Sequence, residues 1–125
     1  MKSWIPLTLA LDLGSAAHAQ TTCTHPTAAD KPPDGNTSTR EQMIAGRTDM
    51  NRYNTEMQSF LDCIKVKIDA IPAPADPKKL TDDEKQQQKE KDKLSKQYDA
   101  AFDELQAAAA RFNEQLKIFK AKQKP

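Results

Sequence analysis

Residues 71–84 read IPAPADPKKLTDDE and separate two long amphipathic segments of the chain. The three prolines disfavour helical geometry in the residues before them, so residues 72–80 are predicted to form a short rigid connector. Thr81 and Glu84 fit a capping box, in which the threonine hydroxyl accepts from the Glu84 backbone N–H and the carboxylate reaches back. A second helix, residues 81–123, is expected to begin there.

The segment before the connector, residues 38–71, is predicted to be the first helix. Ser38 and Glu41 fit a capping box at its start. Apolar side chains in both helices recur at steps of three and four residues, the spacing of a coiled-coil seam. The predicted seam residues are Met43, Met50, Tyr53, Met57, Phe60 and Ile64 in the first helix, and Tyr98, Phe102, Leu105, Phe112, Leu116 and Phe119 in the second. The fold class is therefore all-α, an antiparallel two-helix hairpin packed like a coiled coil.

The two seams differ in extent. Residues 82–93, at the start of the second helix, contain no apolar side chain. In a symmetric hairpin they would lie opposite residues 58–70, which include Phe60 and Ile64. We therefore expect another part of the chain to cover this end of the first helix.

Residues 20–37 contain three prolines and no apolar periodicity, which predicts an extended arm. The only two cysteines are Cys23 in this arm and Cys63 in the first helix. The first helix rises about 37 Å from its start to Cys63, and the roughly 15 residues back to Cys23 span about 47 Å when extended, so the arm can reach. The arm would run antiparallel to the first helix. A disulfide between Cys23 and Cys63 would close a loop of about 40 residues and stabilise the fold by up to about 4 kcal/mol. A disulfide between two copies is the alternative.

Residues 1–19 have the features of an export signal. Lys2 gives a cationic start, residues 4–13 are mostly apolar, and the triplet from Ala17 to Ala19 fits a cleavage site. The apolar stretch is shorter than the roughly 20 residues that a membrane span needs. The sequence therefore predicts an exported protein, periplasmic or secreted, with no membrane span. In such a compartment two cysteines are usually bonded to each other.

Charge is balanced along the chain. The formal net charge is +1, and acidic and basic residues alternate through both predicted helices. A phosphate backbone requires basic residues gathered without interleaved acids, so we expect no nucleic-acid partner. The basic C-terminal tail is typical of a helix end, where cations complement the macrodipole.

Residues that could carry chemistry are few. No Cys-x-x-Cys pair occurs, and His25, the only histidine after residue 19, lies in the proline-rich arm, so we expect no enzymatic activity and no cofactor. A weaker hypothesis is a zinc or copper site built from Cys23, His25 and Cys63, or a copper site from His25, Met50 and Met57. A disulfide would remove both thiolates, and methionine also packs readily at a helix seam.

A pattern over residues 23–64 combines a cysteine, a Pro-Asp-Gly turn, an amphipathic helix and a second cysteine after an aromatic residue. Its members are Cys23, Pro26, Pro33-Asp34-Gly35, Met43, Ala45, Tyr53, Phe60-Leu61 and Cys63. The pattern resembles small exported proteobacterial proteins of unknown function. This resemblance implies export, a helical fold and a Cys23–Cys63 disulfide, and it implies no activity.

A second likeness lies in Leu80-Thr81-Asp82-Asp83-Glu84. It looks like the Leu-Thr-x-x-Gln motif of periplasmic helical chaperones of the Spy and CpxP type, with Glu84 in place of the glutamine and one copy instead of two. Our leading hypothesis is a non-enzymatic exported hairpin that binds a protein partner or self-associates along exposed parts of its seams. The alternative is a chaperone-like binder of unfolded proteins.

Overall fold

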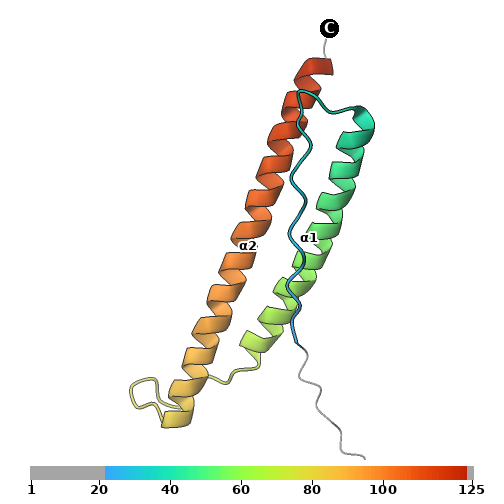
Figure 1. The fold of residues 1–125 in the computed structure, drawn as a ribbon. Coiled ribbons are helices and arrows are strands. Elements are labelled where there is room, and N and C mark those ends of the chain that lie inside the picture. Colours follow the sequence, from blue (N-terminus) through green and yellow to red (C-terminus); the bar gives the residue numbers. More distant parts are fainter. Residues whose placement is uncertain (1–21, 124–125) are drawn as a thin grey trace, which may run out of the picture.

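The computed structural model describes residues 22–123. Helix α1 spans Arg40–Asp69 and helix α2 spans Asp82–Gln123, and this part of the chain contains no strand. The helices pack side by side in opposite directions (Figure 1), which confirms the predicted hairpin. Neither of them is long and apolar enough to cross a membrane. The predicted export signal lies outside the described residues.

The cap of α1 lies one residue later than predicted. Thr39 is the N-cap: its hydroxyl oxygen accepts from the Gln42 N–H at 3.2 Å, and its own N–H donates to Gln42 Oε1 at 2.8 Å. Ser38 cannot form the predicted box with Glu41, because the Ser38 N–H donates to the Asp34 carbonyl oxygen at 2.9 Å in the preceding turn. The turn therefore decides which of two adjacent hydroxyl residues caps the helix.

The predicted cap of α2 is confirmed. The Glu84 N–H donates to Thr81 Oγ1 at 3.2 Å, and the Thr81 N–H donates to Glu84 Oε2 at 2.8 Å. The Ala75 N–H donates to the other Glu84 oxygen at 3.3 Å. These backbone hydrogen bonds, from Thr81 first and then Ala75, hold the pKa of Glu84 below its ordinary value. The connector is thus tied to the first turn of α2.

The core lies between the helices and confirms most of the predicted seam. Its buried side chains are Met43, Tyr53, Met57, Phe60, Leu61 and Ile64 of α1, and Leu94, Ala101, Leu105, Ala108 and Phe112 of α2. Four other predicted seam residues, Met50, Tyr98, Leu116 and Phe119, are half-buried.

Phe102 is the exception: it is 42% exposed, whereas its neighbour Ala101 is 2% exposed. The prediction assumed that α2 contacts α1 alone. The N-terminal arm also packs against α2, so the buried side of α2 is rotated toward the arm. Ala101 and Ala108 then point inward, and Phe102 points outward.

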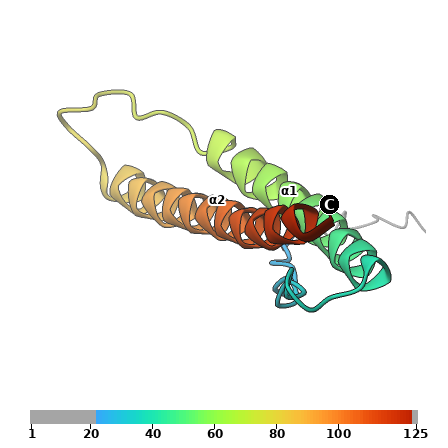
Figure 2. The ribbon, with the colours of Figure 1, turned by 90° about the horizontal axis from the view of Figure 1, so that it is seen from above.

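Helix α2 extends past the end of α1 (Figures 1 and 2), so the expected symmetric register is wrong. Ile64 and Leu94 pack in the same buried cluster and line the same cavity. The start of α2 therefore extends beyond the end of α1, where the polar stretch has no α1 surface to cover.

The arm, residues 22–37, follows one side of the hairpin between the two helices (Figures 1 and 2). Cys23 and Cys63 form an intrachain disulfide with a Cα–Cα distance of 5.6 Å and a sequence separation of 40 residues. This confirms the predicted pairing and the antiparallel course of the arm along α1. The arm consequently runs parallel to α2. We call the surface of the two helices that the arm covers the arm groove; it includes Gly46, Asp49 and Phe60 of α1 and Glu104, Phe112 and Gln115 of α2.

Candidate functional site: the arm groove and the arm-free face

Every third residue of the arm turns toward the groove. Cys23, Ala29 and Pro32 are half-buried, Pro26 and Gly35 are buried, and the residues between them are exposed apart from half-buried Pro33. Three residues per turn is the period of the polyproline II helix. The groove side of the arm therefore presents only small or ring-closed residues, which can lie close to both helices.

Near the disulfide, His25 ties the arm to both helices. Its Nε2 lies 2.9 Å from Glu104 Oε2 on α2, and its ring meets Phe60 of α1 edge to face with the ring centroids 5.1 Å apart. Its Nδ1 lies 2.8 Å from the Pro26 carbonyl oxygen. Each ring nitrogen thus lies within hydrogen-bond distance of an oxygen atom, one on α2 and one on the arm itself.

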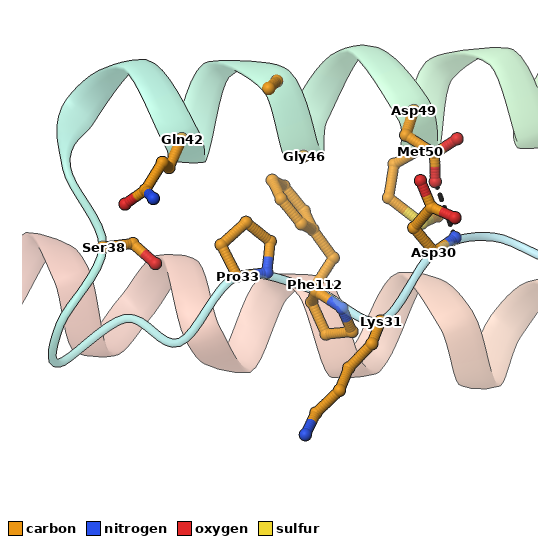
Figure 3. Close-up of a pocket in the computed structure, with 11 residues that line it drawn as sticks. Asp30, Lys31, Pro33, Ser38, Gln42, Gly46, Asp49, Met50 and Phe112 are labelled. Carbon is orange, nitrogen blue, oxygen red and sulfur yellow. Dashed lines mark hydrogen bonds between the residues drawn. The ribbon is translucent and has the colours of Figure 1, made fainter.

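In the middle of the groove, Gly46 allows the arm to approach α1 closely (Figure 3). A Cβ at Gly46 would lie 2.7 Å from Cδ and Cγ of Pro33 and 3.2 Å from the Phe112 ring. Glycine inside a helix costs about 1 kcal/mol relative to alanine. Here it leaves room for the Pro33 and Phe112 rings to pack against the α1 backbone. A cavity of about 360 Å³ lies beside this contact.

Beside this cavity, Asp49 binds the backbone of the arm (Figure 3). Its Oδ2 accepts from the Asp30 N–H at 2.7 Å, and its Oδ1 accepts from Arg52 Nε at 3.0 Å and Nη2 at 2.8 Å. Burial alone would raise the pKa of Asp49, but the Asp30 hydrogen bond and the Arg52 guanidinium outweigh it, so this pKa lies below its ordinary value. An ionised carboxylate thus links the arm to α1.

The far end of the arm is fixed against α2 at Gly35. The Gly35 N–H donates to Gln115 Oε1 at 2.9 Å, and Lys122 Nζ donates to the Asn36 carbonyl oxygen. A Cβ at Gly35 would overlap the Gln115 carbonyl oxygen and lie 2.9 Å from the Phe119 backbone nitrogen. Since both obstacles are helix backbone, only glycine fits at this position without a shift of the arm.

Helix α2 also has an apolar strip on the side away from the arm, formed by Tyr98, Phe102, Ala109 and Leu116, which we call the arm-free face. Phe102, Ala109 and Leu116 each lie two residues before a residue on the arm side of α2. These arm-side residues are Glu104, which binds His25, and Arg111 and Ile118, which line a cleft of about 1170 Å³ beside the arm. Two residues turn a helix by about 200°, so the strip lies opposite these contacts. Phe102 is 42% exposed, and the other members are half-buried.

The candidate metal ligands are not gathered into one site. Cys23 and Cys63 are bonded to each other. His25 contacts Phe60, which lies ten residues from Met50, about 15 Å along a helix. Met57 is 0% exposed in the core. Residues 22–123 hold no group of three or more His, Cys, Asp or Glu side chains arranged to bind a metal ion.

The three-residue repeat of the arm is the feature that the sequence reasoning missed. It is visible in the sequence as Cys23, Pro26, Ala29, Pro32 and Gly35, each three residues after the last. The polyproline II period, beside the helix and strand periods, would have revealed it.

In comparisons with known proteins, the chain matches no protein family, no curated protein and no solved structure.

Proposed function

We propose that this protein is an exported, non-enzymatic interaction module that self-associates through its arm-free face. The exposure of Phe102 carries the proposal, because an aromatic ring 42% exposed between half-buried Tyr98 and Leu116 leaves apolar surface in water. Aromatic side chains contribute strongly to protein interfaces when they become buried. The strip therefore favours a protein partner over a small-molecule substrate.

Spacing and charge favour a second copy as that partner. Phe102, Ala109 and Leu116 are spaced by seven residues, the repeat with which one helix packs along another. In a two-fold dimer the same strip of each copy forms the interface. The formal net charge of +1 keeps electrostatic repulsion between copies small.

Export is supported by the signal-like residues 1–19 and by a disulfide, which persists in oxidising compartments. Terminal sequencing of the protein recovered outside the cytoplasm tests it. We expect the chain to begin at Gln20. Trp4 is the only tryptophan, so the exported protein should also lack tryptophan fluorescence, and an intact Trp4 in that fraction would contradict export with cleavage.

Light scattering over a range of protein concentrations tests self-association. The wild-type mass should rise toward that of a dimer, and Phe102→Ser should remain monomeric. Val66→Ser is the matched control: Val66 is 69% exposed, and it lies two residues after buried Ile64, so it points away from the helix pair. The control should associate like the wild type. A wild type that stays monomeric, or a Phe102→Ser variant that still associates, would contradict the proposal.

The same exposed strip favours a second candidate, chaperone-like binding of unfolded proteins. Exposed apolar patches also bind unfolded chains. In that case near-stoichiometric amounts of this protein should suppress the aggregation of a denatured test protein. The Phe102→Ser variant should lose this effect, and the Val66→Ser variant should keep it. Self-association without this suppression would reject the chaperone candidate.

A further inference from the structure

We propose that the arm groove is a binding site for an extended segment of a partner protein with a small residue at every third position, and that the arm is a built-in occupant held there by the disulfide. This inference concerns the opposite side of α2 from the arm-free face. It does not depend on self-association through Phe102.

The groove already holds a peptide of this kind. The arm packs with a three-residue repeat, and two residues between the repeat positions meet aromatic rings of the groove: His25 meets Phe60, and Pro33 lies with Phe112 over Gly46. Aromatic-lined grooves are the usual recognition surface for polyproline II segments, which lose little conformational entropy on binding. The same surface would therefore accept another segment of the same shape.

Most of the polar contacts that the groove makes are to backbone atoms of the arm. Asp49 binds the Asp30 N–H, Gln115 binds the Gly35 N–H, and Lys122 binds the Asn36 carbonyl oxygen. Such contacts do not depend on the side chains of the bound segment. Selectivity among bound segments then comes from the small residues at every third position, and above all from a glycine at the position of Gly35, which lies against the α2 backbone.

The disulfide keeps this site closed. A segment tethered at both ends has a high effective concentration in the groove, so a free peptide cannot compete with it. Cys23 and Cys63 are half-buried, which leaves the bond partly accessible. A partner dithiol would open it by exchange, becoming a disulfide itself while Cys23 and Cys63 together take up two electrons and two protons as thiols.

Fluorescence anisotropy with a labelled peptide tests the proposal. The probe is residues 22–37 with Cys23→Ser, and the receptor is the full chain with Cys23→Ser and Gly35→Ala, which opens the disulfide and weakens the contact of its own arm with α2. The receptor and the oxidised comparison protein, which has an unaltered arm, both carry Phe102→Ser, so that the arm-free face does not contribute to binding. We expect saturable binding to the released receptor and none to the oxidised protein with an unaltered arm. A probe with Gly35→Ala should bind at least about tenfold more weakly, because each 1.4 kcal/mol of lost contact is a factor of ten. A probe with Asn36→Ala, a change at an exposed position, should bind like the original.

Absence of binding by a receptor whose circular dichroism shows intact helices would overturn the proposal, and so would equal binding of the Gly35→Ala probe. If the double substitution unfolds the receptor, the protein with an unaltered arm is measured before and after reduction. Its arm stays tethered at one end after reduction, so the probe should bind only at high concentration, only after reduction, and be released on reoxidation. A dimer of the Cys23→Ser chain in the Phe102→Ser background would show that the groove takes the arm of a second copy, and that result would reject a partner protein as the occupant.

Discussion

Gly46 of α1 and Pro33 of the arm are in direct contact, such that a Cβ at Gly46 would lie 2.7 Å from two atoms of the proline ring. Gly35 has the same relation to the α2 backbone at the other end of the arm. Both glycines of the described chain are therefore places where the arm meets a helix. The arm is a third packed element of the fold, and the stability of the hairpin should depend on it.

Gly46→Ala separates helix propensity from packing. Propensity alone predicts a gain of about 1 kcal/mol, because alanine favours the helix. The contact with Pro33 predicts a loss of about 1 to 3 kcal/mol from overpacking instead. Urea unfolding measures the sign. In the Pro33→Ala background, which removes the obstructing ring atoms, the same change should become neutral or stabilising, and a gain in the wild-type background would contradict the arm placement.

Cys23→Ser should lower the free energy of unfolding by up to about 4 kcal/mol, because it opens a long loop. This is a large part of the roughly 5 to 15 kcal/mol that stabilises a typical domain. Release of the arm should also expose the region around Phe60 and Ile64 to a hydrophobic dye. Thermal melting and dye fluorescence measure both effects. An unchanged melt without dye binding would mean that the arm does not cover the helices.

Acid should weaken the attachment of the arm at Asp49. The folded-state pKa of Asp49 lies below its ordinary value, so its ionised form stabilises the fold. This stabilisation is present above the ordinary carboxyl pKa of about 4 and is lost as the pH falls through the lowered value. Asp49→Asn keeps an acceptor for the Asp30 N–H but loses the charge. The unfolding free energies of wild type and variant should therefore differ more at neutral pH than in acid, and an equal difference at both would contradict the role of the charge.

Ala101→Leu and Ala109→Leu test the orientation of α2. Ala101 is 2% exposed in the core, so extra methylene groups there should cost about 1 to 3 kcal/mol. Ala109 is half-buried on the arm-free face, and the same change should cost less than about 0.5 kcal/mol, as at most surface positions. Urea unfolding of the two variants compares them. The reverse order would contradict the rotation of the buried side of α2 toward the arm.

The architecture could be predicted because its signals are local. The prolines between residues 71 and 78, the Thr81–Glu84 cap and the heptad spacing each act within a few residues, and together they define two helices and a turn. The disulfide followed from chain length and from the presence of only two cysteines. Ser38 was mistaken for the cap because Ser38 and Thr39 fit the same motif. Only the turn at Asp34, which engages the Ser38 N–H, distinguishes them.

The remaining differences arise from the arm, whose contacts join residues far apart in the sequence. Because the arm packs against α2, the buried side of that helix includes Ala101 and leaves Phe102 outside. Hydrophobicity alone favours the larger side chain for the core, so the rotation was not evident from α2 by itself. The register was missed for a related reason, since a symmetric hairpin was assumed where α2 is the longer helix.

The most direct test of the packed arm compares two adjacent alanines, Ala28 and Ala29. Ala28 is exposed, and Ala29 lies on the three-residue repeat and packs against the core. Thermal melting of Ala28→Leu and Ala29→Leu, each with the disulfide intact, measures whether the arm has a defined inner side. We predict that the melting temperature of Ala29→Leu is several degrees below that of the wild type and that Ala28→Leu melts at the wild-type temperature. Equal melting temperatures for the two variants would contradict an arm packed in the groove with a polyproline II repeat.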